Sequence, residues 1–174
     1  MPEFRMPATT MHESFVAALR EFRRDNGSRP GYVDRLDPDE LADVRIFAEF
    51  VDQLCADPVE EAARTPGLVP QTTLWWCAGH TEFVGRLAIR HYLIPALERK
   101  GGHIGYDVRP SARRQGHGTA MLKAALPVAR YLGIDRALIT CDSGNLASRR
   151  VVEKNGGELI DDIGGVRRFW VPTG

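Results

Sequence analysis

The hydrophobic residues in the first part of the chain recur with the period of an α-helix. Between His12 and Arg24, apolar side chains lie three or four positions apart, which places them on one face of a helix. These side chains are Phe15, Ala18, Leu19 and Phe22. Residues 26–31 (NGSRPG) are rich in helix breakers, so we expect this amphipathic helix to end before them.

A second amphipathic helix is predicted to begin at Asp37. The sequence DPDE at 37–40 places an aspartate at the N-cap, a proline at the first helical position and a glutamate three residues after the cap. The apolar face that follows consists of Leu41, Val44, Phe47, Ala48, Val51 and Leu54. Residues 57–70 are rich in proline and predict a loop.

From Thr72 the hydrophobic pattern changes to that of β-strands. The segments TTLWWCA (72–78), FVGRLAIRHYL (83–93) and GGHIGYDV (101–108) predict three strands. The sequence GHTE (79–82) predicts a hairpin turn between the first two of them. This part of the chain is therefore expected to form a meandering sheet.

The remainder of the chain mixes helical and strand patterns. Residues 119–132 predict a helix, and RALITC (136–141) predicts a buried strand. LASRRVVEKNGG (146–157) predicts a short helix that ends at a glycine, and ELIDD and VRRFWV predict a closing pair of strands. Helices first, and then a sheet crossed by two helices, indicate a mixed α/β or α+β fold.

Composition and charge narrow the class of protein. The chain has 174 residues, of which 43% are hydrophobic and 26% charged, as expected for a soluble globular protein of one domain. Its 23 basic and 23 acidic residues balance, which argues against a general binder of nucleic acids or anionic membranes. No apolar run approaches the length of about 20 residues that spans a bilayer, and the N-terminus does not have the apolar core of a signal peptide.

The cysteines and histidines bear on the compartment and on metals. Cys55, Cys77 and Cys141 are too far apart for a CxxC motif, and an odd number argues against a disulfide framework. We therefore expect a reduced, cytoplasmic protein. The histidines are scattered without the spacing of metal ligands, so no metal is expected.

The segment after the third predicted strand carries the clearest chemical signal. Gly116 and Gly118 remove side chains at a helix start, where the first amides have no partners within the helix and the helix dipole adds positive charge. Arg113 and Arg114 add charge suited to phosphate oxygens. The segment therefore predicts a cradle for phosphate, most readily a pyrophosphate.

Two common phosphate cradles do not match this segment. A P-loop needs a lysine directly after its second glycine, and none is present. A dinucleotide fingerprint needs its glycines directly after the strand, and its third glycine is replaced here by Met121. The pattern [Q/R]xxGx[G/A] does match, and residues 113–118 (RRQGHG) supply it.

With these motifs, the sequence resembles the GNAT superfamily of N-acetyltransferases over about residues 70–174. The motifs appear in the family's order, as Val108-Arg109-Pro110, RRQGHG, CDSGNLAS (141–148) and EKNGG (153–157). They look most like a bacterial subgroup of acetyltransferases that act on small molecules. The resemblance implies a mixed, mostly antiparallel twisted sheet, flanked by helices and splayed between its fourth and fifth strands.

The resemblance also implies one domain over residues 1–174 and a reaction. Residues 1–70 would form the acceptor side, and residues 71–174 would form the acetyl-CoA-binding core. An acetyl group would pass from acetyl-CoA to the primary amine of a small molecule, by direct attack in a ternary complex. No nucleic acid or membrane partner is implied, and a homodimer remains open.

By the same resemblance, particular residues would bind acetyl-CoA. The backbone of one strand would pair with the pantetheine arm, amides of the arginine-glycine loop would hold the pyrophosphate, and two residues after the next strand would lie near the pantetheine. In chain order these residues are Tyr106, Asp107, Val108, Arg113, Arg114, Gln115, Gly116, His117, Gly118, Thr119, Asn145 and Ser148.

The chain departs from the family at the catalytic positions. The tyrosine that protonates the leaving thiolate in many members is replaced by Val152. The carboxylate base near the start of the fourth strand is also missing, and His103 is the candidate base that remains. Trp75, Arg90 and His91 are candidates for contact with the acceptor.

Several alternatives stay open at this level. Asn145 is equally suited to capping a helix, and His103 to a structural hydrogen bond within a strand. The missing acid and base favour a catalytically inactive acyl-CoA-binding regulatory module as an alternative to an enzyme. A nucleotide-binding domain of another family is a further alternative, against which the failed dinucleotide pattern counts.

Overall fold

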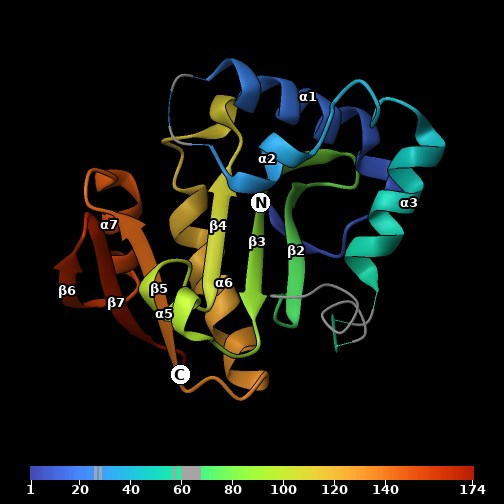
Figure 1. The fold of residues 1–174 in the computed structure, drawn as a ribbon. Helices are drawn as coiled ribbons and strands as arrows, with labels where there is room; N and C mark the ends of the chain where they lie inside the picture. Colours follow the sequence, from blue (N-terminus) through green and yellow to red (C-terminus); the bar gives the residue numbers. More distant parts are fainter. Residues whose placement is uncertain (26, 28, 57, 60–67) are drawn as a thin grey trace. The chain divides into compact units, whose positions relative to one another are not determined.

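The computed structural model describes residues 1–25, 27, 29–56, 58–59 and 68–174 and is shown in Figure 1. The chain divides into two compact units. The first comprises Met1–Asp57, Thr73–Arg86 and Asp107–His117; the second comprises Pro58–Thr72, Leu87–Tyr106 and Gly118–Gly174. Three of the boundaries between the units lie within strands, at residues 72–73, 86–87 and 106–107, and none lies at residue 70. Most of the predicted loop at 57–70 lies outside the described residues.

The first sheet has the strand order β1-β2-β3-β4. These strands are β1 (Glu3–Arg5), β2 (Gln71–Ala78), β3 (Glu82–Arg90) and β4 (Ile104–Val108). The sequence pattern did not predict β1, which pairs antiparallel with β2. β3 and β4 are also antiparallel, because Arg109 N–H donates to Val84 O (2.9 Å) and Arg90 N–H donates to His103 O (2.8 Å) at their opposite ends.

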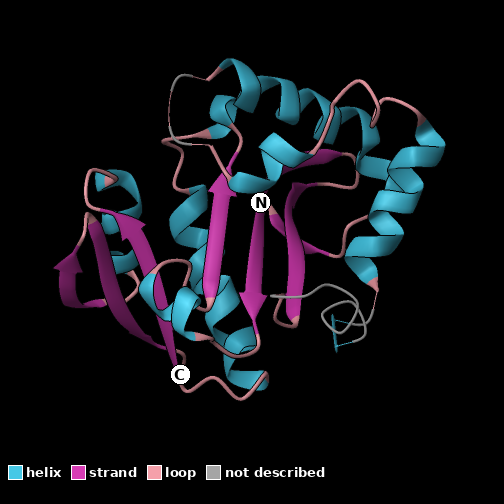
Figure 2. Ribbon diagram, in the orientation of Figure 1, coloured by secondary structure: helices cyan, strands magenta, loops and turns pink. Residues whose placement is uncertain are grey.

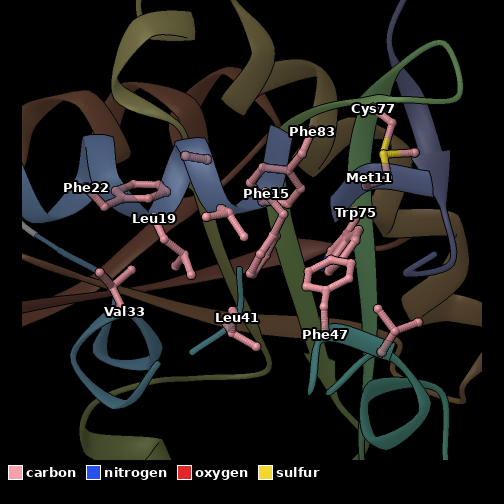
Figure 3. Close-up of a cluster of buried hydrophobic side chains, with 13 residues drawn as sticks. Met11, Phe15, Leu19, Phe22, Val33, Leu41, Phe47, Trp75, Cys77 and Phe83 are labelled. Atoms are coloured by element: carbon pink, nitrogen blue, oxygen red, sulfur yellow. The ribbon is translucent and has the colours of Figure 1, made fainter. Parts of the chain in front are cut away.

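The helices of the first unit supply most of its core. They are α1 (His12–Arg24), α2 (Gly31–Arg35) and α3 (Val44–Cys55), preceded by a 3₁₀ turn at Thr9–Met11. The predicted bounds and apolar face of α1 are confirmed, since Phe15, Ala18, Leu19 and Phe22 are all buried. Figure 3 shows Phe15 beside Phe47 of α3, Trp75 of β2 and Phe83 of β3.

The predicted start of the second long helix is wrong by several residues. Asp43 caps α3, because its carboxylate accepts hydrogen bonds from the amides of Arg45 (2.8 Å) and Ile46 (3.4 Å). Asp37 instead accepts from the amide of Asp39 (2.8 Å) and holds a separate turn. Asp37 and Asp43 each accept hydrogen bonds from the amides of a following turn. The sequence pattern alone therefore did not identify which of them begins the helix.

The second unit contains a sheet with the strand order β5-β7-β6, in which both pairings are antiparallel. Its strands are β5 (Arg136–Asp142), β6 (Glu158–Ile163) and β7 (Val166–Pro172). Its helices are α6 (His117–Tyr131) and α7 (Leu146–Lys154), and α6 stays continuous through Pro127. Figure 2 shows these strands and helices by type, and the expected mixed fold with antiparallel sheets is confirmed.

A short helix that the sequence did not predict lies between two strands, and both strands are shorter than predicted. α5 (Pro95–Arg99) follows β3, which ends at Arg90, and precedes β4, which begins at Ile104. Gly102 returns the chain to the sheet with a φ of +62°, and a Cβ atom there would lie 2.3 Å from Leu138 O. Only glycine fits this approach.

β4 and β5 are edge strands of the two separate sheets. At the base of these strands, His103 N–H donates to Leu138 O at 2.7 Å. Beyond this contact the two strands do not form a ladder within the described residues. The expected opening between the fourth and fifth strands is therefore present in the second unit.

None of the helices in the described parts of the chain is long and apolar enough to cross a membrane.

Candidate active site

A cavity of about 260 Å³ lies within the second unit, between β4 and β5. β4 lines it with Ile104, Gly105 and Tyr106, and β5 lines it with Thr140, Cys141 and Asp142. Asn145 and Ser148, at the start of α7, complete one wall. Since both strands are sheet edges, backbone groups on two sides of the cavity are available to a ligand.

Asn145 caps a helix and also lines the cavity. Its Oδ1 accepts a hydrogen bond from the amide of Ser148 at 3.0 Å, so it is the N-cap of α7. The same residue lines the cavity. The hydrogen bond of the cap therefore holds Asn145 and Ser148 together in the wall of the cavity.

Two hydroxyl groups share a hydrogen bond in the wall of this cavity. Tyr106 Oη and Ser148 Oγ are 2.9 Å apart. Burial raises the pKa of Tyr106 to about 12, so the phenol keeps its proton at neutral pH. Val152, the position of the missing tyrosine, is fully buried and has no proton to donate.

The segment between β4 and α6 has an open backbone. Arg114 has a φ of +63° and Gly116 a φ of +85°, and both residues are exposed. A Cβ atom at Gly116 would meet nothing within 4 Å. The first turn of α6 carries no acidic residue. An anion can therefore approach the amides at this helix start without steric or charge repulsion.

The arginines of this segment differ in their partners. Arg109 forms an ion pair with Glu21 of α1, and Arg113 pairs with Asp25 at 2.5 Å. Burial alone would raise the pKa of Glu21, but its hydrogen bonds to Arg109 and Ser111 outweigh that and hold it below its usual value. Arg113 lowers the pKa of Asp25 in the same way. Of these three arginines, Arg114 alone has no ion pair within the described residues, and it is exposed.

His103 lies in a structural position. Its Nδ1 accepts a hydrogen bond from the amide of Leu138 at 2.9 Å, which leaves the proton of the neutral ring on Nε2. Burial and the nearby charge of Arg90 lower its pKa. The residue lines a different cavity of the second unit, of about 390 Å³, together with His91. The geometry favours the structural alternative that the sequence left open.

The three predicted acceptor residues are not brought together. Trp75 is fully buried and stacks on Phe15 at 4.8 Å, so it is a core residue and the expectation of a ligand contact does not fit its position. Arg90 donates to the carbonyls of Gly101 and Gly102 and lines the cavity between β4 and β5. His91 lines the second cavity and bonds to Thr72 at 2.9 Å.

The sequence missed one polar group of the first unit. The side chain of Asp107 accepts a hydrogen bond from Tyr32 Oη at 3.0 Å, and burial raises its pKa to about 7. Asp107 was expected to contribute its backbone alone. The sequence contained one sign of this polar group, a single acidic residue within the strand predicted at 101–108. No group of three or more potential metal ligands occurs in the described part of the chain.

A comparison with protein families identifies the chain. A family described as "Acetyltransferase (GNAT) domain" matches residues 17–158, which is more than half of the chain. The chain belongs to the GNAT acetyltransferase family. It is accordingly an acetyl-CoA-dependent acetyltransferase, and the resemblance of its motifs to this family is confirmed.

Several solved structures have the same fold as this chain. The GNAT family acetyltransferase from Streptococcus pneumoniae has a TM-score of 0.62 and 17% identity, with 100% of each chain covered. Mycobacterium smegmatis RimJ in complex with CoA-disulfide has a TM-score of 0.64 and 18% identity, covering 97% of this chain and 79% of its own.

A third similar structure is that of an N-acetyltransferase with coenzyme A. The PaiA N-acetyltransferase from Thermoplasma acidophilum, in complex with coenzyme A, has a TM-score of 0.57 and 14% identity, covering 99% of each chain. At such identities the likeness establishes the fold alone. A comparison with curated protein sequences finds no match.

Proposed function

We propose that this chain is an N-acetyltransferase whose acceptor is the primary amine of a small molecule. The observation that carries the proposal is the cavity between the edges of β4 and β5, because unpaired strand edges can bind an extended chain of amides. The pantetheine arm of acetyl-CoA is such a chain. When bound, acetyl-CoA supplies an acetyl thioester that an amine can attack directly in a ternary complex.

The edge of β4 and the start of α7 would hold the pantetheine arm of acetyl-CoA. The backbone of β4 at Tyr106, Asp107 and Val108 is at a sheet edge and can donate and accept hydrogen bonds like a neighbouring strand. Asn145 and Ser148 would contact the same arm, since both line the cavity. Arg90 also lines it and remains a candidate for contact with the bound molecules.

The pyrophosphate would bind at the start of α6. The left-handed φ of Gly116 and the absence of acid in the first helical turn support this role. The sequence predicts that Arg113 contacts the phosphates, but its guanidinium forms an ion pair with Asp25. We therefore assign Arg113 to stabilising the loop. The amides that would bind phosphate oxygens belong to Arg114, Gln115, Gly116, His117, Gly118 and Thr119.

The hydroxyl pair of Tyr106 and Ser148 would supply the proton that the buried Val152 cannot. The two hydroxyls are within hydrogen-bonding distance of each other in the wall of the cavity. A thiol with a pKa near 8.5 is a fair leaving group without help, so this contribution is modest.

Ser148→Ala is therefore expected to lower kcat by about 10-fold to 100-fold and, because Ser148 would also contact the pantetheine arm, to raise the KM for acetyl-CoA. The measurement is release of the CoA thiol under saturating acetyl-CoA. Ala147→Ser is the matched control, since it adds a hydroxyl to an exposed neighbouring position. A Ser148→Ala enzyme with the full kcat would exclude the hydroxyl pair as proton donor.

The proposed function is tested first by a thermal melt. Acetyl-CoA at about 100 times its Kd should add roughly 2.7 kcal/mol to the free energy of unfolding, and NADH and ATP should add much less. Thiol release is then measured with a panel of primary amines. Binding of acetyl-CoA with thiol release identifies the acceptor class, whereas binding without release from any amine would support a catalytically inactive acyl-CoA-binding module instead.

A further inference from the structure

β4 and β5 are joined at His103, the residue immediately before β4. His103 N–H donates to Leu138 O at 2.7 Å, and Leu138 N–H donates to His103 Nδ1 at 2.9 Å. On the other side, His103 O accepts a hydrogen bond from the amide of Arg90 in β3 at 2.8 Å. The imidazole therefore takes the place that a backbone carbonyl would have in a continuous ladder between β4 and β5.

This pair of hydrogen bonds lies at one end of the cavity between β4 and β5. Ile104, the first cavity residue of β4, directly follows His103, and Thr140, the first cavity residue of β5, is two positions after Leu138. The described parts of the two strands form no ladder beyond this point. The separation of the strand edges along the cavity therefore depends on how the strands are joined here.

Only a neutral imidazole can make the side-chain half of this junction. The amide of Leu138 is a donor, so Nδ1 must carry a lone pair, and the proton of the neutral ring is then on Nε2. A protonated imidazole has an N–H group at both nitrogens, which places one donor against another. Leu138 is buried, so its amide would lose its acceptor in a place where water does not replace it.

The surroundings of His103 oppose that protonation. Burial lowers the pKa of the imidazole, and the charge of Arg90 lowers it further. His103 also lines the second cavity, of about 390 Å³, whose other charged or titratable side chains are His91, Tyr92, Glu98, Asp135 and Arg136. Of the two acids, Asp135 forms an ion pair with Arg130 at 2.6 Å. The imidazole is therefore neutral at pH 7 and takes up a proton only in acid.

We propose that His103 is a positioning residue of the donor site, which sets the separation of β4 and β5 along the cavity and weakens the binding of acetyl-CoA when it is protonated. The inference rests on the proposed function, in which the pantetheine arm lies between these two strand edges. His103 touches no bound molecule in this role. When the imidazole is protonated, a single backbone hydrogen bond joins the strands, so the edges that bind the arm are less well preorganised.

The primary test compares two substitutions of His103 in the full chain. In His103→Asn, the side-chain oxygen can take the place of Nδ1 and accept from the Leu138 amide, but it does not titrate. His103→Leu has no acceptor. By isothermal titration at neutral pH, His103→Asn should bind acetyl-CoA within about twofold of the wild type, and His103→Leu should bind it about 10-fold more weakly.

The pH dependence of binding separates this role from a merely structural one. As the pH falls from about 7.5 to about 5, the Kd of the wild type should rise at least about threefold more than that of His103→Asn, whose junction does not titrate. Protonation of acetyl-CoA itself affects both proteins equally and cancels in this comparison. His80→Asn is the matched control and should follow the wild-type curve, because His80 is exposed and lines neither cavity.

A measurement on the free protein distinguishes failure of the junction from failure of the donor site. In ¹⁵N NMR at neutral pH, His103 should show an unprotonated Nδ1, and His103→Asn assigns its signals. A protonated Nδ1, or equal pH dependence of the wild type and His103→Asn, would overturn the role of His103 and leave the proposed function intact. These two results decide even if His103→Leu does not fold. A wild type with the expected Nδ1 that binds no acetyl-CoA would overturn the proposed function and, with it, the effect on binding.

Discussion

Gly118→Leu is expected to weaken the binding of acetyl-CoA by about 100-fold or more, which corresponds to a loss of about 2.7 kcal/mol. A Cβ atom at this position would already lie 3.3 Å from Val151 Cγ2 and 3.8 Å from Tyr106 Cε2. The rest of a leucine side chain has no room on that side. It must project toward the open face of the helix start, where it would cover the amides proposed to hold the pyrophosphate.

The measurement is isothermal titration with acetyl-CoA, combined with a melt of the free protein to confirm folding. Ala120→Leu is the matched control, because Ala120 is an exposed residue two positions further along α6. Its affinity should stay within about twofold of the wild type. If Gly118→Leu binds acetyl-CoA as tightly as the control, the start of α6 does not hold the pyrophosphate.

Trp75→Ala is expected to lower the free energy of unfolding by about 3–5 kcal/mol. The indole is fully buried, stacks on Phe15 and meets the edge of Phe83 at 5.4 Å between ring centroids (Figure 3). Its ring nitrogen has no hydrogen-bond partner among the residues that the structure describes, so the loss comes from packing and from the cavity that remains. Because whole domains are stable by about 5–15 kcal/mol, this one change removes a large share.

Chemical denaturation monitored by circular dichroism measures this change in stability. Tyr131→Ala is the control, since it removes another large aromatic ring, at a position that is 90% exposed. The control should change the unfolding free energy by about 0.5 kcal/mol or less. Equal stability of the two variants would mean that the aromatic cluster around Trp75 does not form in solution.

The sequence predicted the elements whose pattern is strong and local. The apolar stripe of His12–Arg24 corresponds to α1 without any shift of its bounds. The alternation after Thr72 located β2, β3 and β4, and the spacing of the motifs identified the family. Such signals depend on neighbouring residues alone, so a single sequence contains them.

Elements that depend on distant partners were missed. β1 is three residues long and exists as a strand because it pairs with β2, about 70 positions away. α5 is a short helix that begins at a proline. The strand patterns on either side of it gave no sign of a helix between them. Short elements of this kind are fixed by the contacts around them and carry little pattern of their own.

The candidate site shows the same division. The arginine-glycine loop and the pair Asn145–Ser148 are sequence motifs and were found directly. The surroundings of Asp107 were not, because its partner Tyr32 is 75 positions earlier in the chain. Trp75 was expected at a ligand, but β2 is buried on both faces, so strand alternation did not separate core from surface there.

Two ion pairs hold the segment between β4 and α6, so this segment cannot be transplanted alone. Arg109 and Arg113 are held by Glu21 and Asp25, 88 positions earlier in the chain in both cases. A fragment or chimera that begins after Asp25 would keep every residue of RRQGHG and lose the carboxylates that hold Arg109 and Arg113. Engineering this segment into another scaffold therefore requires an acid in the last turn of a helix and a second acid at its C-cap, as well as the segment itself.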